Sequence, residues 1–183
     1  MRKTTLLAAL AVGAVLVATA VQAANPNARL ATGNLYIGLL DPGRVTCIGG
    51  EPTPPGTFPL CTPETKRVVW RDHVGVMSMD AVSGPAAPWV PPVIQSLGNC
   101  NLDRLWDGPC WGTFEAEWLG GTWAGTYSGS LDFVGFAGNL KFVGHGNGGE
   151  IDGMQIFIEA ACGPTGDPYA PMPFVVRVQK VDE

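Results

Sequence analysis

The chain has 183 residues, of which 46% are hydrophobic and 15% charged, and this is enough for one domain with a substantial core. Its 25 glycines and 16 prolines interrupt the stretches in which long helices form, which excludes an all-α fold. The net charge is −5 and the 11 Lys and Arg residues are scattered, so we expect no nucleic-acid partner.

The N-terminal segment predicts export. Arg2 and Lys3 precede an uncharged apolar run, and Val21-Gln22-Ala23 has the small-residue spacing of a signal-peptidase site. We interpret 1–23 as a signal helix that is cleaved, which leaves one domain at 24–183; an uncleaved membrane anchor is the alternative. Cleavage leaves 9 basic and 16 acidic residues. The sequence thus predicts a secreted or periplasmic protein that is not inserted in a membrane.

Five cysteines follow the signal segment, and an oxidising compartment makes disulfides their expected state. Proximity along the chain favours the pairs Cys47–Cys61 and Cys100–Cys110, although other pairings remain open at this point. This arrangement leaves Cys162 outside both bridges.

The prolines divide the domain into two halves. Eleven of them lie between Pro26 and Pro92, whereas 111–162 has none. Because proline cannot donate to a strand ladder, we expect a loop-rich first half at 24–110, with strands at 35–40 and 68–79, and a regular meander at 111–181. The proline-rich stretch 82–99 is expected to form a loop across a barrel mouth.

The second half alternates between apolar and polar residues with a period of two, which is typical of strands with one buried and one solvated face. Five such strands are expected, at 113–118, 122–133, 139–146, 151–162 and 174–178, with a tight turn at Gly120-Gly121. Together with the upstream strands they predict an all-β protein. The expected fold is a single antiparallel up-and-down β-barrel of about seven or eight strands, with proline-rich, disulfide-tied loops.

Two glycine-rich segments resemble a known superfamily. Residues 121–129 read GTWAGTYSG and residues 144–154 read GHGNGGEIDGM. They are similar to the paired strands of the allene-oxide-cyclase-like and dirigent-like β-barrels, which carry a G-T-W-x-G strand and a later glycine-spaced turn. The resemblance covers roughly 111–173. It implies a barrel architecture and carries over none of the catalytic positions with which the plant enzymes handle an oxylipin or orient coupling radicals.

The sequence has few signatures of chemistry. It has no serine in a nucleophile elbow, no phosphate-binding loop, and no C-x-x-C or paired histidines, so we expect no catalytic residue, metal site or cofactor. Glu115 and Glu117 share a strand face, either as a glycosidase-like or calcium-binding pair or as plain surface charge. His145 is expected in a glycine-rich turn, hydrogen-bonded to local backbone or acting as a general base.

Four residues are the predicted ligand contacts. Trp89 and Trp106 belong to loops, where partial exposure is expected, Tyr127 lies on the apolar face of its strand, and His145 lies near the later turn. We therefore predict that the protein binds a small apolar or amphipathic ligand in the barrel mouth without turnover.

Two alternatives remain. The first is an isomerase or cyclase acting on a lipid-like substrate, which requires Gln155 or Glu159 to point inward, against their predicted faces. The second is a structural or interaction protein of the cell envelope, which requires a filled interior and an exposed apolar patch.

Overall fold

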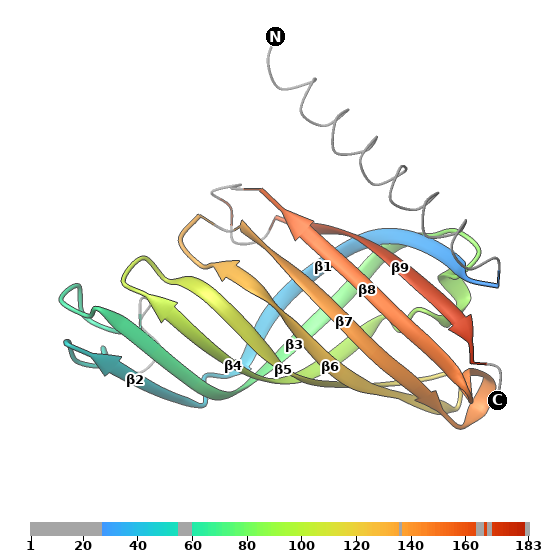
Figure 1. The fold of residues 1–183 in the computed structure, drawn as a ribbon, viewed down its shortest axis with the longest axis horizontal. Helices are drawn as coiled ribbons and strands as arrows, with labels where there is room; N and C mark the ends of the chain where they lie inside the picture. Colours follow the sequence, from blue (N-terminus) through green and yellow to red (C-terminus); the bar gives the residue numbers. More distant parts are fainter. Residues whose placement is uncertain (1–26, 55–59, 136, 164–166, 168–169, 182–183) are drawn as a thin grey trace, which may run out of the picture.

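The computed structural model describes residues 27–54, 60–135, 137–163, 167 and 170–181, and the predicted signal segment lies outside them. Nine strands and two short 3₁₀ helices follow one another along this part of the chain (Figure 1). The strands are β1 (Arg29–Asp41), β2 (Arg44–Ile48), β3 (Arg67–Ser83), β4 (Val93–Asp103), β5 (Asp107–Trp118), β6 (Gly121–Asp132), β7 (Ala137–Asn147), β8 (Met154–Cys162) and β9 (Met172–Lys180). The helices are η1 (Ala87–Trp89) and η2 (Gly149–Ile151).

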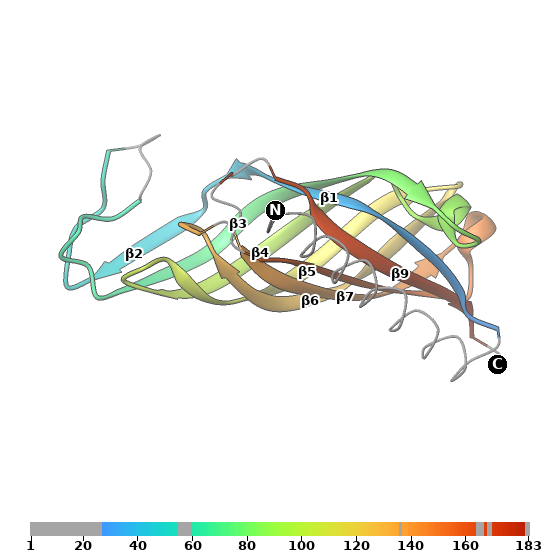
Figure 2. The same ribbon diagram turned by 90° about the horizontal axis from the view of Figure 1, so that it is seen from above.

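Eight of the strands close into a barrel. Neighbouring strands pair antiparallel in the order β1-β9-β8-β7-β6-β5-β4-β3, and β1 also pairs with β3, which completes the circle (Figure 2). β2 pairs with β3 outside this circle. The predicted up-and-down barrel is therefore confirmed, with one strand added to it.

The barrel wall is incomplete at one end. β1 pairs with β9 only from Arg29 to Leu35, whereas its pairing with β3 continues to Asp41. Beyond Leu35, the described part of β1 therefore has a ladder partner on one side only. At the same end β2, β3, β4 and β5 extend past the rest of the barrel (Figure 1).

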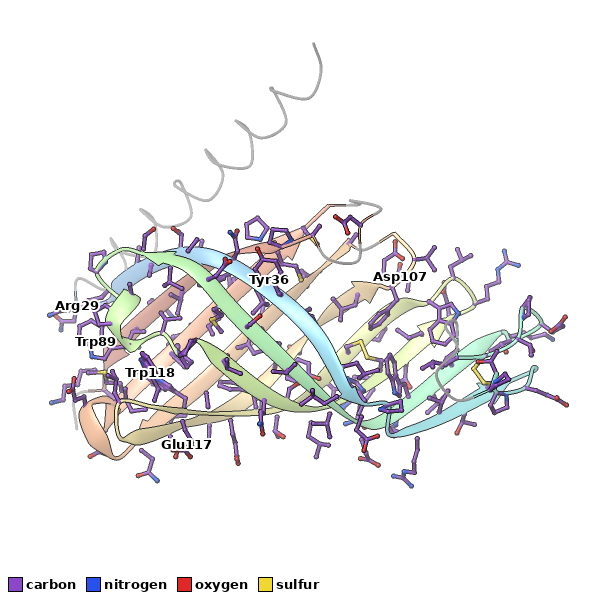
Figure 3. All side chains as sticks on the ribbon, turned by 180° about the vertical axis from the view of Figure 1, so that it is seen from behind. Arg29, Tyr36, Trp89, Asp107, Glu117 and Trp118 are labelled. Carbon is purple, nitrogen blue, oxygen red and sulfur yellow. A yellow bond between two sulfur atoms is a disulfide. The ribbon has the colours of Figure 1, made fainter. Side chains whose placement is uncertain are left out.

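The interior is apolar and falls into two clusters. The larger fills most of the barrel and includes Leu35, Phe114, Trp123, Phe142, Ile156 and Ile158. The smaller lies towards the extended end and consists of Cys61, Val68, Trp70, Cys100, Leu102, Trp106 and Cys110. Strands β5 to β9 alternate between buried and exposed positions, with apolar side chains inside and mainly polar ones outside, where Trp111 and Val143 are exceptions. Figure 3 shows the side chains on the ribbon, with Glu117 labelled on β5.

Both predicted disulfides are present. Cys47 is bonded to Cys61, and Cys100 is bonded to Cys110. The second bridge joins directly opposed positions of β4 and β5. Cys162 lies outside both bridges, at the end of β8. The bridges indicate an oxidising environment for the folded protein.

Three local expectations were wrong. The loop expected at 82–99 is shorter, because β3 continues to Ser83 and β4 begins at Val93. The turn after β5 is formed by Leu119 and Gly120, both with positive φ, one residue earlier than expected. The first half is also more regular than its proline count suggests, since it contains β1 to β4 in full.

No helix in the described ranges is long and apolar enough to cross a membrane.

A bulge in β3 changes which side chains face the interior. Asp72 has a φ of 57°, and the pairing with β4 shifts between Trp70 and His73. Trp70 and His73 consequently both point inward, with ring centroids 4.6 Å apart. Asp72 is left on the outside, where it forms an ion pair with Arg44.

A candidate ligand site in the barrel interior

A cavity of about 270 Å³ lies towards the extended end of the barrel. Its wall is mainly apolar and takes Met77, Trp70, Leu131 and Phe133 from the two hydrophobic clusters, together with the exposed Ile37 and Leu39 of β1. Three polar side chains share this wall, His73, Ser96 and Tyr127, and none of the described lining residues is Asp, Glu, Lys or Arg. An apolar hollow with a few converging polar groups is the usual form of a small-molecule site.

Two glycines create the space in which the polar side chains meet. His73, Gly98, Gly112 and Tyr127 occupy neighbouring register positions on β3, β4, β5 and β6. A Cβ atom at Gly98 would overlap both the hydroxyl oxygen of Tyr127 and Nε2 of His73, and one at Gly112 would lie 2.7 Å from Cε1 of Tyr127. The rings of His73 and Tyr127 therefore both lie over the backbone of Gly98, where no side chain separates them.

Ser96 anchors the tyrosine. Burial raises the pKa of Tyr127, and a hydrogen bond with Ser96 partly offsets this rise. Ser96 is itself buried, and a Cβ at Gly75 on the adjacent strand would lie 2.7 Å from its hydroxyl oxygen. The phenol therefore stays protonated at neutral pH and can donate or accept a hydrogen bond.

His73 is the least satisfied polar group of the site. Only 9% of its surface is exposed, and its Nδ1 has no hydrogen-bond partner among the residues that the structure describes. Burial lowers the pKa of His73, and the nearby charge of Asp72 opposes this shift. The imidazole is therefore neutral at neutral pH, with one nitrogen that donates and one that accepts.

The part of β1 that lies beyond its pairing with β9 contributes to the cavity wall. Ile37 and Leu39 line the cavity and are 42% and 48% exposed, and Phe133 opposite them is half-buried. The described lining residues on this side of the cavity are thus apolar and partly exposed.

The structure separates the four predicted ligand residues. Tyr127 lines the cavity, as the prediction requires. Trp106 is only 6% exposed and belongs to the smaller cluster, so its expected partial exposure was wrong; its φ of 64° turns the chain so that the indole folds back into the core. His145 lies exposed within β7 on the outer face, rather than in a turn, because the ladder with β8 continues through it.

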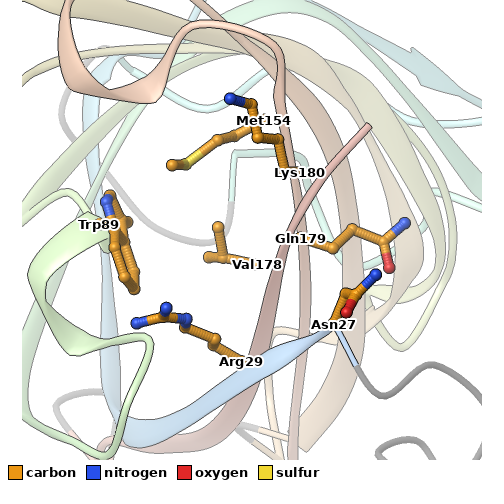
Figure 4. Close-up of a pocket in the computed structure, with 7 residues that line it drawn as sticks. All are labelled: Asn27, Arg29, Trp89, Met154, Val178, Gln179 and Lys180. Atoms are coloured by element: carbon orange, nitrogen blue, oxygen red, sulfur yellow. The ribbon is translucent and has the colours of Figure 1, made fainter. Parts of the chain in front are cut away.

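Trp89 lies at the opposite end of the barrel, in the segment 84–92 that covers this end. The indole N–H groups of Trp118 and Trp123 donate to the carbonyls of Pro88 and Trp89, at 2.9 and 3.1 Å. A hollow of about 390 Å³ beside Trp89 is lined by Arg29, Lys180 and other residues (Figure 4). The Arg29 guanidinium lies 4.9 Å from the centre of a Trp89 ring. This hollow is more polar than the interior cavity and is separate from it.

The predicted carboxylate sites face solvent. Glu115 and Glu117 are exposed on the outside of β5, where Glu117 accepts a hydrogen bond from Thr122. Glu159 forms an ion pair with Lys141 on the outside of β8, at 3.2 Å. Among the described residues, no three His, Cys, Asp or Glu side chains gather as a metal ion requires.

Sequence reasoning missed two members of the site, His73 and Ser96. The available signal was weak, because Ser96 fell in a stretch read as loop and the bulge at Asp72 reverses the inward face of β3. The run of glycines that share the inner face, Gly75, Gly98 and Gly112, is the feature that points to an interior space. Comparison with known proteins finds no match for the chain among protein-family models, curated proteins or solved structures.

Proposed function

We propose that the protein binds a small apolar or amphipathic ligand in this interior cavity without turning it over. The observation that carries the proposal is a cavity of about 270 Å³ whose wall is apolar apart from His73, Ser96 and Tyr127. Each square ångström of apolar ligand surface removed from water there stabilises the complex by about 25 cal/mol. Hydrogen bonds from the polar side chains of the wall would set the orientation of the ligand in the cavity.

Binding is favoured over catalysis by the titration of the same groups. General acid–base catalysis works best when the pKa of the catalytic group lies near the working pH. Burial lowers the pKa of His73 and raises that of Tyr127, so both move away from neutrality. An uncharged site of this kind is suited to holding a ligand.

The test is a calorimetric titration of the purified, disulfide-bonded protein with a panel of apolar and amphipathic compounds. Leu39→Glu places a charge on the rim of the cavity and should weaken binding by roughly tenfold or more. Leu40→Glu is the matched control, because Leu40 is 61% exposed and does not line the cavity. A panel without any binder, or equal losses in the two variants, would refute the proposal.

An isomerase or cyclase is the second candidate, and the pairing of His73 with Tyr127 in an apolar cavity is the observation that favours it. Glu159 is exposed outside the barrel, and Gln155 accepts a hydrogen bond from Gln179, so neither is the interior acid or base that this function requires. His73 and Tyr127 would take these roles instead. Incubating each ligand with a small amount of protein separates the two functions. Binding returns the compound unchanged, whereas an enzyme accumulates an isomer.

We also propose that the protein is exported through residues 1–23 and works in the periplasm or outside the cell. The two disulfides support this location, because they persist in oxidising compartments. N-terminal sequencing of the exported protein should begin at Ala24, and a chain that keeps Met1 would contradict it. The resemblance to allene-oxide-cyclase-like barrels stays a prediction.

A further inference from the structure

The hollow of about 390 Å³ at the end of the barrel covered by the segment 84–92 has a composition unlike that of the interior cavity. Its described lining includes the apolar side chains of Trp89, Met154 and Val178 and the cations Arg29 and Lys180. Figure 4 shows the other four of these side chains around Val178. None of the described lining residues is Asp or Glu. The hollow therefore joins an apolar surface to positive charge.

The two cations occupy inward-facing positions at the ends of their strands. Arg29 is opposite Val178 on the β1–β9 ladder, and Lys180 is opposite Met154 on the β8–β9 ladder. Further along, the same faces of β1 and β9 are mainly buried and apolar. Because Lys180 follows Val178 by two residues, it stands diagonally to Arg29, at a spacing of about 7–8 Å that long side chains can bridge. One anion above Val178 can therefore contact both cations.

The described part of the chain supplies no carboxylate to this pair. Neither Arg29 nor Lys180 forms an ion pair there. Asp152, in the turn before Met154, instead accepts a hydrogen bond from the amide of Gly148, at 2.8 Å. The whole chain has 16 acidic and 11 basic residues, so two neighbouring cations without a carboxylate differ from its average surface. Their positive potential favours an anion in the hollow.

Trp89 positions the guanidinium of Arg29. The guanidinium carbon lies 4.9 Å from the centre of a Trp89 ring, which is a cation–π contact. Trp89 is itself held in place, because its carbonyl accepts a hydrogen bond at 3.1 Å from the indole of Trp123, a fully buried side chain. A guanidinium over a ring keeps the N–H donors along its edge, where a carboxylate can bind them in pairs.

We propose that this hollow is a second binding site, for a small organic anion in which a carboxylate is joined to an apolar body. The carboxylate binds Arg29, with Lys180 as the second cation, and the apolar body covers Val178 and Met154. The site is separate from the interior cavity, so either site can fail its test without the other.

The experiment compares three probes that share a phenyl ring: benzoate, benzyl alcohol and benzylamine. Each is titrated at neutral pH and low salt into the ¹⁵N-labelled, disulfide-bonded protein, and the indole resonances are followed by NMR. Trp89 reports on the hollow and Trp70 on the interior cavity. Benzoate should shift the Trp89 resonance with an affinity about tenfold higher than that of benzyl alcohol, because it gains two exposed charge contacts worth up to about fivefold each. Benzylamine should bind most weakly.

Three variants assign the effect to these side chains. Arg29→Gln should weaken benzoate binding about fivefold. Arg104→Gln is the matched control, because Arg104 is exposed between β4 and β5 at the extended end of the barrel. Two carboxylates, Asp182 and Glu183, follow Lys180 in the sequence. The double variant Asp182→Asn, Glu183→Gln should bind benzoate at least as tightly as the wild type.

The inference is wrong if benzoate has no advantage over benzyl alcohol at Trp89, or if Arg29→Gln and Arg104→Gln lose equal affinity. Loss of binding in the double variant, or a benzoate shift confined to Trp70, would overturn it as well. A measurement on the wild type alone adds a further check. Raising the salt concentration from about 20 mM to about 200 mM should weaken the binding of benzoate and leave that of benzyl alcohol unchanged. A benzoate affinity that does not respond to salt would contradict the assigned charge contacts.

Discussion

Gly98 and Tyr127 are arranged so that the absence of one side chain makes room for the other. The tyrosine hydroxyl occupies the space that a Cβ at Gly98 would take, two strands away in the sheet. The position of the Tyr127 side chain, which lines the cavity, therefore depends on a residue without a side chain. This relationship places the polar head of Tyr127 beside His73 instead of in the packed core.

Gly98→Ala should displace Tyr127 and narrow the cavity. We expect a loss of about 1–3 kcal/mol in the free energy of unfolding, typical of overpacking, together with weaker ligand binding. Urea denaturation and probe titration measure the two effects. Gly163→Ala is the control, because its Cβ would meet nothing within 4 Å. Equal stability of the two variants would show that Tyr127 moves aside freely.

The stability of the fold should depend on the protonation of His73. Burial lowers its pKa in the folded state below the ordinary value of 6.5, with Asp72 opposing the shift and the neutral Tyr127 facing the ring. As the pH falls through that value the unfolded chain takes up a proton first, so the free energy of unfolding decreases.

Unfolding free energies of the wild type and His73→Phe, measured between about pH 8 and about pH 5, test this. The wild type should lose more stability than the variant on acidification. His145, exposed on β7, is present in both proteins and cancels in the comparison. Parallel curves would show that His73 titrates normally in the fold.

The disulfide between β4 and β5 should stabilise the extended end of the barrel. Replacing both Cys100 and Cys110 by alanine should lower the free energy of unfolding by about 2–4 kcal/mol, because the unfolded chain gains freedom. Guanidinium titrations under non-reducing conditions provide the measurement. Cys162→Ala, outside both bridges, should have a clearly smaller effect. A double variant as stable as the wild type would contradict this account.

The placement of the segment 84–92, at the opposite end of the barrel from the cavity, should depend on two indole hydrogen bonds. Trp118→Phe removes the bond to Pro88 and should cost about 0.5–1.5 kcal/mol. Trp123→Phe removes the bond to Trp89 and should cost more, because this side chain is fully buried and a phenyl ring leaves part of its volume empty. Hydrogen exchange of the Trp89 and Val90 amides should rise in both variants. Unchanged exchange would mean that other contacts hold the segment.

The meander from β5 to β9 could be predicted because one face of its strands packs in the apolar core and the other faces water. Phe114 and Ala116 lie inside while Glu115 and Glu117 lie in water, so the alternation in the sequence is the alternation in space. β4 lacks this contrast: its inward positions include Ser96 and Gly98, whereas Leu97 is 48% exposed on the outside. No alternation therefore offsets the prolines of 82–99, from which the sequence predicts a loop.

The inward position of His73 was harder to predict, because it depends on a backbone bulge. A period of two counted from Trp70 places Asp72 inside and His73 outside, and the bulge at Asp72 reverses both assignments. A bulge of one residue leaves no strong mark in the sequence, because Asp tolerates a positive φ without being confined to it. Proximity along the chain, in contrast, was sufficient to predict both disulfides.

The early separation of β1 from β9 leaves Ile37 and Leu39 on a stretch of strand that pairs with β3 alone among the described residues. A ligand that entered beside these two side chains would reach His73 and Tyr127 through the barrel wall, without displacing the segment 84–92 at the far end or the packed core around Trp123. The rate of ligand exchange would then depend on side chains of β1 that lie outside this core.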